Sequence, residues 1–297
     1  MAILIDEHSR VLVQGITGKE GSKATKEMID YGTTILCGVT PGKGGDLIEN
    51  RPVYDSVREA VEVFPDINVS VIYVPPLSAK DSVLEAIKNG ISLVVLITET
   101  VPIQDCAVMI SCARKYGATL VGPSSIGIIS PEKSKVGSIG GNSNIQFTQG
   151  PVGIISKSGG MCSETAMILK KAGFGTSTVV GIGGDAISGS DFCDILELFE
   201  KDDQTKVIVL FCEIGGLYEK KAAEFIKSNI SKPVIAYVSG KFAQQLPQVS
   251  LGHAGAILEG KETTYESKVN YFKKNGVMVV NQHHQIIDYV KSVLEKK

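Results

Sequence analysis

A histidine between two glycines is the residue of this chain best suited to do chemistry. It is His253, in the segment Leu251-Gly252-His253-Ala254-Gly255-Ala256-Ile257, and only four histidines occur in 297 residues. Glycine lets a loop turn tightly and lets a bulky ligand come close. Imidazole on such a loop can act as a nucleophile, a base or a carrier of a phosphoryl group. The alternative is a surface histidine with no chemical role.

Two further segments could support that histidine. Glu213 follows the apolar run 207–211 after one residue, Cys212, and a carboxylate at a strand end can orient an imidazole. It could equally be a helix cap or a salt-bridge residue. The run Ser156-Lys157-Ser158-Gly159-Gly160 joins a predicted strand to a predicted helix, so its exposed amides could cradle an anion. Ser158 could instead be a simple helix cap.

Glycine-rich turns also follow the first two predicted strands. Gly15-Ile16-Thr17-Gly18-Lys19-Glu20-Gly21 has the spacing GxxGxxG, not the GxGxxG of dinucleotide sites. It would open a helix whose free amides favour an anion, or it could reflect tight packing alone. The second turn, residues 39–45, carries Lys43 where a dinucleotide enzyme often has an acidic residue for the ribose. A lysine there favours an additional phosphate.

Short apolar strands alternate with helix-length segments along the whole chain. Continuous apolar strands in such an alternation predict parallel sheets covered on both faces. The stretch 124–149 is rich in Gly, Ser and Asn, and it is typical of a linker or loop. We therefore predict an α/β protein with a Rossmann-like domain at 1–130, and a flavodoxin-like, doubly wound parallel domain at 131–297. Ligands of such sheets bind beyond the carboxyl ends of the strands, where the glycine-rich turns fall.

Composition argues against several classes of protein. Net charge is −2, which gives no reason to expect a nucleic-acid partner. No apolar run is long enough for a membrane span, and the amino terminus does not resemble a signal peptide. The six cysteines are scattered, with no CxxC pair, which favours reduced thiols in a cytoplasmic protein over a disulfide framework or a metal site.

Taken together, the motifs resemble those of succinyl-CoA synthetase α subunits and their relatives, the nucleoside-diphosphate-forming acyl-CoA synthetases. The resemblance spans essentially the whole chain, and this set of motifs in this order is specific to the family. It rests on these segments: AILID from Ala2, GITGKEG from Gly15, GVTPGKGG from Gly38, VIYVPP from Val71, VGIGGD from Val180, EIGG from Glu213 and GHAGAI from Gly252.

The resemblance implies an acid–thiol ligase with a known division of roles. The first domain would bind CoA through Thr17, Gly18, Lys19, Glu20, Lys43 and Pro75. His253 would carry a phosphoryl group, Glu213 would hold its ring, and Ser158, Gly159 and Gly160 would bind the phosphate and the acid. The chain shows no nucleotide-binding pattern of its own. The resemblance implies ATP and Mg²⁺ on a larger, β-type ATP-grasp subunit, where the family places them, in a hetero-oligomer, and no metal on this chain.

Departures from the succinate enzymes bear on the acid. The cradle reads SGGM from Ser158 where those enzymes usually read SGTL, and residues 122–127 read GPSSIG in place of a GPNCPG-like segment. The basic stretch expected before GHAG is replaced at 242–250, and residues 136–141 read VGSIGG. These features resemble the citrate-using branch of the family. Citrate is therefore the predicted acid, in a citryl-CoA synthetase small subunit; succinate and malate are the alternatives, and drift without a change of substrate is another.

Two other classes remain as alternatives at this point. A nicotinamide-dependent oxidoreductase would share the Rossmann-like first domain, but it would not explain the missing GxGxxG or Lys43. A CoA-binding sensor without catalysis would not need GHAGAI or Glu213.

Overall fold

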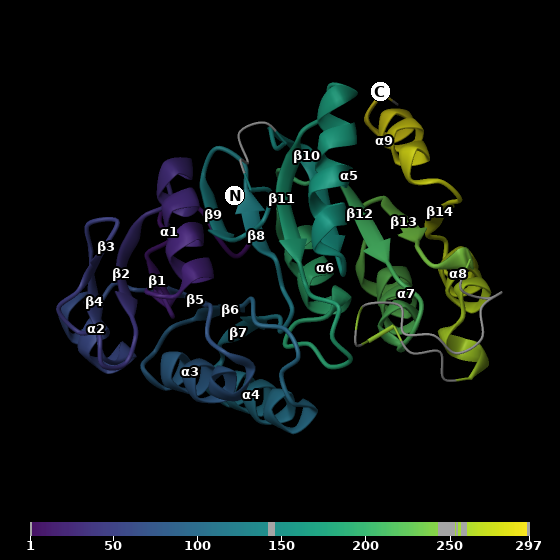
Figure 1. The fold of residues 1–297 in the computed structure, drawn as a ribbon. Helices are drawn as coiled ribbons and strands as arrows, with labels where there is room; N and C mark the ends of the chain where they lie inside the picture. The colour runs from purple at the N-terminus through teal and green to yellow at the C-terminus, as the bar shows by residue number, and fades with distance from the viewer. Residues whose placement is uncertain (1, 142–145, 243–252, 254, 257–259, 296–297) are drawn as a thin grey trace.

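The computed structural model describes residues 2–141, 146–242, 253, 255–256 and 260–295. Two seven-stranded sheets organise the described chain, each covered by helices (Figure 1). The strands are β1 Val11–Gln14, β2 Ile35–Val39, β3 Leu47–Ile48, β4 Arg51–Tyr54, β5 Val69–Ile72, β6 Leu93–Leu96, β7 Thr119–Val121, β8 Gly127–Ser130, β9 Ser134–Gly137, β10 Gln149–Ser156, β11 Thr176–Gly181, β12 Val207–Cys212, β13 Val234–Val238 and β14 Met278–Val280. The helices are α1 Lys19–Tyr31, α2 Val57–Val63, α3 Pro76–Lys88, α4 Ile103–Tyr116, α5 Gly159–Lys171, α6 Phe192–Lys201, α7 Tyr218–Asn229, α8 Tyr265–Lys274 and α9 Ile286–Leu294, with 3₁₀ turns at Lys261–Thr263 and His283–Gln285.

The first sheet has the strand order of a dinucleotide-binding fold. Its order is β3-β4-β2-β1-β5-β6-β7, and every pair except β3–β4 is parallel. The parallel strands numbered along the chain read 3-2-1-4-5-6, the Rossmann order. The order reverses around β1, so the turn after Gln14 lies at the switch point where such sheets bind ligands. The predicted Rossmann-like first unit is confirmed.

The second sheet is flavodoxin-like with an added hairpin. Its order is β14-β13-β12-β10-β11-β8-β9. The five strands from β10 onward are all parallel and read 2-1-3-4-5, the flavodoxin order. The switch point lies around β10, between β11 and β12. The carboxyl ends of these three strands therefore lie side by side, because Ser156 pairs with Gly181 on one side and with Phe211 on the other.

The prediction of a linker at 124–149 was wrong in its first half. Residues 127–130 and 134–137 form an antiparallel hairpin that adds to β11. All eight residues are buried. Glycines at both ends of the hairpin made the segment look irregular, but Gly127 and Gly137 pair with each other and pack so closely that a Cβ on Gly127 would overlap the carbonyl of Val136. Close backbone approach, not a loop, explains these glycines.

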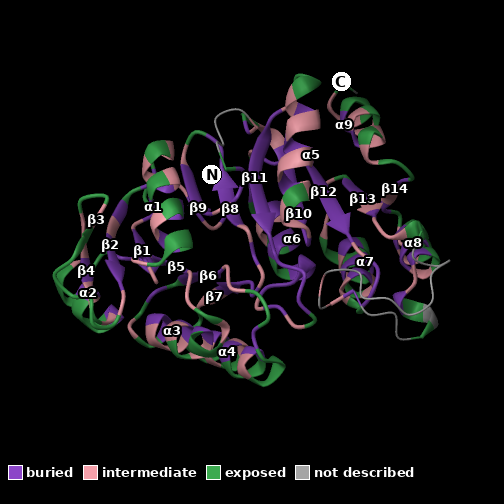
Figure 2. Cartoon of the chain, viewed as in Figure 1, coloured by how far each residue is buried: buried purple, intermediate pink, exposed green. Residues whose placement is uncertain are grey.

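Helices cover both faces of each sheet, and buried residues gather between the layers (Figure 2). Helices α2, α3 and α4 pack on one face of the first sheet. Helices α5 and α9 pack on one face of the second sheet. A single apolar cluster joins α1 and the other face of the first sheet to α6, α7, α8 and the other face of the second. The two sheets thus share a core, and this fixes the turns of one relative to those of the other.

The chain changes sheets between Val121, the last residue of β7, and Gly127, the first of β8. The domain boundary expected at residue 130 stays a prediction. None of the helices in the described part of the chain combines the length and apolar character that a membrane span requires. All six cysteines are free thiols, and five are buried.

Candidate active site at the carboxyl edges of the sheets

His253 and Glu213 form a direct pair. His253 Nδ1 lies 2.7 Å from Glu213 Oε2, and the His253 side chain is 36% exposed while that of Glu213 is 15% exposed. A carboxylate can only accept, so Nδ1 carries the proton and donates it. In the neutral imidazole this leaves the lone pair on Nε2, the nitrogen away from Glu213. The pair therefore presents a nucleophilic nitrogen at the edge of the second sheet.

The imidazole ring of His253 lies directly against the backbone of Gly184, in the turn that follows β11. A Cβ built on Gly184 would lie 2.5 Å from Cγ and 2.6 Å from Nδ1 of the ring. Gly255 N donates to Gly184 O at 2.9 Å, and Ala256 N donates to His253 O at 3.0 Å. The described part of the histidine loop is thus docked on the β11 turn. The remaining residues of the GHAGAI segment, and the replaced stretch 243–250, lie outside the described residues.

Glu213 raises the pKa of His253 above its usual value. The largest cause is the hydrogen bond from the ring to Glu213, which outweighs burial of the ring. Charges on three other elements also act on it: Glu99 after β6 raises the pKa, Lys157 after β10 lowers it, and Asp185 after β11 faces the same ring. Burial is the main cause that raises the pKa of Asp185 itself.

Helix α5 presents its amino terminus at the same edge. Ser158 is the N-cap residue, and within the described chain no side chain caps the first amides of α5. The backbone of Ser158 is fixed by the side chain of Ser156. The Ser156 Oγ accepts from Ser158 N at 3.1 Å and donates to Ser158 O at 2.7 Å. A Cβ at Gly160 would meet no described atom within 4 Å, so Gly160 faces open space. Uncapped amides beside open space form a place for an anion.

The predicted CoA residues gather at the carboxyl edge of the first sheet. Thr17 Oγ1 donates to Thr40 Oγ1 at 3.1 Å, which joins the turn after β1 to the turn after β2. Gly18 is the N-cap of α1, and Gly18, Lys19 and Glu20 are exposed. Pro75 is the N-cap of α3, just beyond β5, and is also exposed. Because β2, β1 and β5 are neighbours, these residues line one edge.

Lys43 lies on an exposed turn fixed by a residue that the sequence analysis missed. Asp55 Oδ1 accepts from Lys43 N at 3.0 Å and from Gly44 N at 2.9 Å. The carboxylate therefore fixes the turn through its backbone amides, and the Lys43 side chain stays exposed. An aspartate shortly after a strand gave no distinctive signal in the sequence, because its partners are backbone amides.

The two edges are joined where the chain passes from one sheet to the other. Ser125 Oγ donates to Gly181 O at 2.6 Å and accepts from Gly127 N at 2.9 Å. Gly183 packs against the backbone of Pro123 and Ser124. The segment 122–127, which departs from the pattern of the succinate enzymes, thus contacts the same turn that supports the His253 ring.

Comparison with known proteins identifies the family of this chain. Residues 6–100 match the model of the CoA binding domain, and residues 155–278 match that of the CoA-ligase family. The α subunit 1 of succinate–CoA ligase [ADP-forming] from Archaeoglobus fulgidus is 46% identical over 295 residues, which cover 99% of each chain. The corresponding α subunit from Methanothermobacter thermautotrophicus is 46% identical over 98% of this chain and 97% of its own.

The chain belongs to the family of succinate–CoA ligase α subunits. The resemblance noted from the motifs is thereby confirmed, as are an acid–CoA ligase and a CoA-binding first domain. Among solved structures, ATP citrate lyase from Methanosaeta concilii in complex with (3S)-citryl-CoA superposes with a TM-score of 0.90 at 27% identity. The match covers 98% of this chain and 51% of that chain, so the present chain spans about half the length of that lyase.

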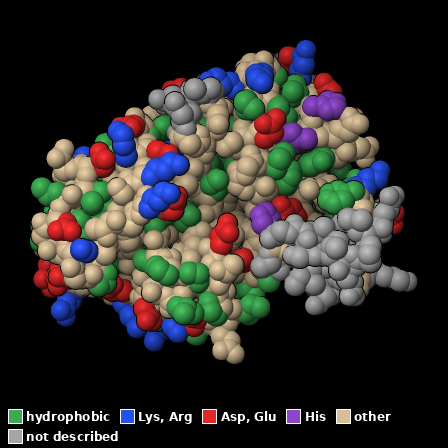
Figure 3. Space-filling model, in the orientation of Figure 1, with side chains coloured by type: hydrophobic (Ala, Val, Ile, Leu, Met, Phe, Trp, Pro, Cys, Tyr) green, Lys and Arg blue, Asp and Glu red, His purple; other side chains and the backbone are tan. Residues whose placement is uncertain are grey.

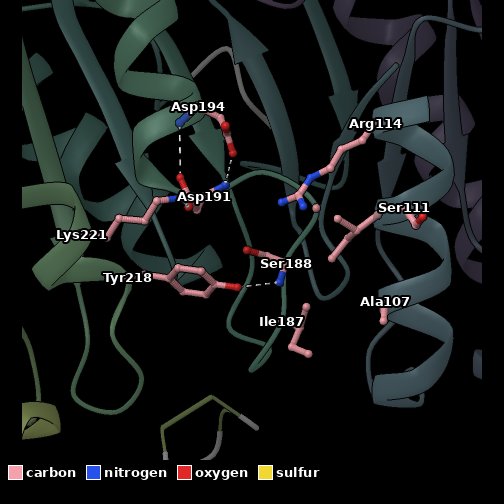
Figure 4. Close-up of a pocket in the computed structure, with 11 residues that line it drawn as sticks. Ala107, Ser111, Arg114, Ile187, Ser188, Asp191, Asp194, Tyr218 and Lys221 are labelled. Atoms are coloured by element: carbon pink, nitrogen blue, oxygen red, sulfur yellow. Dashed lines mark hydrogen bonds and ion pairs between the residues drawn. The ribbon is translucent and has the colours of Figure 1, made fainter. Parts of the chain in front are cut away.

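A cavity of about 450 Å³ lies between α4 and α7, and its lining residues differ from those of the candidate active site. Figure 4 shows Arg114 of α4 pointing toward it from one wall and Tyr218 and Lys221 of α7 from the other. Asp191 and Asp194 on its wall are already engaged, with each other in the cap of α6 and with Lys221. None of the residues predicted to act on CoA, phosphate or acid lines this cavity.

Gly21→Ala is expected to weaken CoA binding selectively. A Cβ on Gly21 would overlap the carbonyl of Gly15, so the turn after β1 would have to move away from α1. Overpacking of this kind costs about 1–3 kcal/mol of stability. We expect a raised KM for CoA and an unchanged extent of His253 phosphorylation. Lys23→Ala, an exposed position on the same helix, is the control; an unaltered KM in a folded Gly21→Ala variant would contradict the placement of CoA at this turn.

Proposed function

We propose that this chain is the α-type subunit of a succinate–CoA ligase that works through a phosphohistidine on His253. The observation that carries the proposal is the 2.7 Å contact between His253 Nδ1 and Glu213 Oε2, which directs Nε2 outward as a nucleophile. A catalytic histidine held by a carboxylate in this way can accept and release a phosphoryl group. Covalent catalysis of this kind divides one difficult condensation into easier steps.

The residues of the second sheet fit each step. Neutral His253 would attack phosphorus through Nε2, while its Nδ1 proton stays on the hydrogen bond to Glu213. The free amides of Gly159 and Gly160, next to the N-cap residue Ser158, would stabilise the phosphoryl oxygens at the start of α5. Transfer to the carboxylate of the acid gives an acyl phosphate, and attack by the CoA thiol releases phosphate and forms the thioester.

The CoA thiol would reach this site from the first sheet. Thr17, Gly18, Lys19 and Glu20 would surround the phosphates of CoA at the start of α1, with Lys43 and Pro75 nearby. The open amides of α1 suit an anion. The contact of segment 122–127 with the β11 turn supports a path from this edge to His253.

A larger, β-type ATP-grasp subunit would complete the enzyme as a hetero-oligomer. The matched relatives are named α subunits, which supports a partner. That subunit would bind ATP with Mg²⁺ and supply the phosphoryl donor. Figure 3 shows acidic and basic side chains interspersed over the viewed face. A cytoplasmic location remains part of the proposal.

Succinate is better supported as the acid than the citrate predicted from the motifs. The relatives at 46–48% identity over 99% of this chain are named succinate–CoA ligases. The prediction of citrate rested on the cradle from Ser158 to Met161, on residues 122–127 and 136–141, and on the replaced stretch 242–250. Changes of this kind are compatible with drift without a change of substrate.

Citrate is retained as a second candidate because of one observation. Gly160 adds no side chain where the structure leaves open space, so the cradle has room for a larger acid. The lyase that superposes at a TM-score of 0.90 is in complex with citryl-CoA, which supports this option. Malate, intermediate in size, is the third acid to test.

Discharge of the phosphorylated enzyme separates these acids. The chain copurified with its larger partner is phosphorylated with ATP and Mg²⁺, freed of nucleotide, and offered CoA with succinate, citrate or malate. We expect loss of the phosphoryl group and formation of succinyl-CoA, measured by mass spectrometry. Discharge by citrate alone would overturn succinate in favour of citrate. Discharge by none of these acids would overturn the proposed substrate class.

Glu213→Gln is expected to shift the pH dependence of phosphorylation. The raised pKa of His253 means that its neutral, nucleophilic form is lost as pH falls through that raised value. An amide removes the charge of Glu213, so the pKa falls and the midpoint of the phosphorylation rate against pH moves lower. Poorer orientation of the ring should lower the rate at high pH by about 10- to 100-fold. A midpoint that stays in place would contradict the role of Glu213.

A further inference from the structure

A buried ionic cluster lies directly behind the His253–Glu213 pair. Lys157 is 4% exposed, Glu219 is not exposed, and Lys268 is 1% exposed. They come from three elements: Lys157 follows β10, Glu219 lies in the first turn of α7, and Lys268 lies on α8. The roles assigned above to His253 and Glu213 make no use of this cluster.

Glu219 holds the turn that carries Glu213. Its Oε1 accepts from Glu213 N at 3.4 Å and from Lys157 Nζ at 3.3 Å. Its Oε2 accepts from Lys268 Nζ, which also donates to Gly215 O. A single carboxylate is therefore linked to both ends of the turn from Glu213 to Gly215, and to the cation that follows β10.

Lys157 is the member of the cluster coupled to the catalytic pair. Burial opposes its charge, but Glu219 and then Glu213 more than offset this, and the pKa of Lys157 is raised. Lys157 in turn lowers the pKa of His253. The groups that face Lys157 from the surrounding elements are Glu219, Glu213, Cys212, Lys268 and the ring of Tyr218, whose centroid lies 5.8 Å from Nζ.

The charges of the buried cluster and Glu213 balance each other before phosphorylation. Lys157 and Lys268 offset Glu219 and Glu213 while His253 is neutral. A buried ion pair is a poor source of stability compared with apolar side chains of the same size, so stability alone does not explain it. A phosphoryl group on Nε2 would add a charge of about −2, as phosphorylation of other side chains does. A fixed cation beneath the pair then favours the phosphorylated state.

We propose that Lys157 is a positioning residue for phosphoryl transfer: its buried ammonium, held by Glu219, offsets Glu213 and stabilises the phosphohistidine of His253. The inference rests on the proposed function. In the step concerned, the Nε2 lone pair forms the N–P bond, and the P–O bond to the leaving diphosphate of a nucleoside triphosphate breaks. The Nδ1 proton stays shared with Glu213, and Lys157 exchanges no proton.

Two variants, Lys157→Met and Glu219→Gln, test the electrostatic role in the complex with the partner subunit. Each should shift the pH midpoint of His253 modification, and the direction of that shift is the test. Diethyl pyrocarbonate modifies neutral imidazole, so the pH midpoint of His253 modification, followed by peptide mass, reports its protonation without any phosphorylation. Losing the cation in Lys157→Met should move the midpoint to higher pH. Losing the anion in Glu219→Gln should move it to lower pH. Lys157→Arg should keep the wild-type midpoint, and Lys201→Met, exposed on α6, is the matched control.

A purely structural role predicts a different pattern. If Lys157 only held the Glu213 turn, both variants would loosen the contact with His253, and both midpoints would fall. That result, or an unchanged midpoint in a folded Lys157→Met, would overturn the inference. If Lys157→Met does not assemble, Lys157→Gln replaces it.

The yield of phosphohistidine supplies the second measurement. We expect about a tenfold fall in the phosphorylated fraction at equilibrium in Lys157→Met, from the loss of one nearby charge, with rescue by Lys157→Arg. An unchanged fraction would overturn the inference. Wild-type protein that is never phosphorylated on His253 would instead sink the proposed function, while the modification midpoints would still report on the electrostatic coupling.

Discussion

His253→Ala is expected to abolish acid–CoA ligase activity in the assembled enzyme, lowering turnover by about 10⁴-fold or more. The variant lacks the only atom that we assign to accept the phosphoryl group, so no covalent intermediate can form. The ring contact with Gly184 is lost, but the hydrogen bond from Gly255 N to Gly184 O, which also docks this loop on the β11 turn, is left intact. We therefore expect normal assembly and normal CoA affinity, measured beside steady-state turnover of succinate, CoA and ATP.

His8→Ala is the matched control for this variant. His8 is exposed and precedes β1, at the opposite end of that strand from the turn that carries Thr17, and its loss should leave turnover unchanged. Residual turnover of His253→Ala near that of the wild type, in a preparation free of wild-type enzyme, would rule out a phosphohistidine at this residue. Loss of activity that came with loss of CoA binding would point to misfolding, which thermal melting of the complex detects.

Gly184→Ala is expected to impair phosphorylation almost as strongly, although residue 184 carries no reactive group. The added Cβ would lie 2.5 Å from Cγ of His253, far inside the contact distance of two carbon atoms. The ring must move by about 1 Å, and a misplacement of that size can lower the rate about 100-fold. The measurement is the single-turnover rate of His253 phosphorylation by mass spectrometry.

Two other observations separate this steric effect from a general loss of structure. The backbone of Gly184 does not lie in the left-handed region, so alanine fits the local conformation. The KM for CoA, which depends on the first sheet, should stay within error of the wild type. Phosphorylation of Gly184→Ala at the normal rate would show that the ring does not rest on residue 184 in the working enzyme.

The strand ends of this protein could be predicted well from its sequence. The apolar runs of β1, β2, β10, β11 and β12 are each followed by a glycine-rich turn, and parallel sheets collect such turns at one edge. This pattern predicts that Ser158 and Glu213 lie on one edge of the second sheet. The pairing of Glu213 with His253, forty residues apart, came from the family resemblance, because neither periodicity nor composition relates a strand end to a distant loop.

Each feature that the sequence analysis missed has its own physical cause. The hairpin β8–β9 was taken for a loop because its glycines permit close strand approach instead of turns. Asp55 acts on backbone amides, which leave no trace in the sequence. Lys157 and Lys268 are 62 and 49 residues from Glu219, and isolated charged residues ordinarily indicate solvent exposure. Only the packing of α7 and α8 against the second sheet shows that these charges are buried together.

The most direct test of the central claim is the site of phosphorylation in the chain copurified with its larger partner. The complex is incubated with ATP and Mg²⁺, digested under alkaline conditions that preserve phosphohistidine, and mapped by peptide mass spectrometry. The account predicts one phosphoryl group, on the peptide that contains His253, and its loss when CoA and the acid are added. An active complex in which His253 never carries phosphate, or carries it without discharge, would contradict the account.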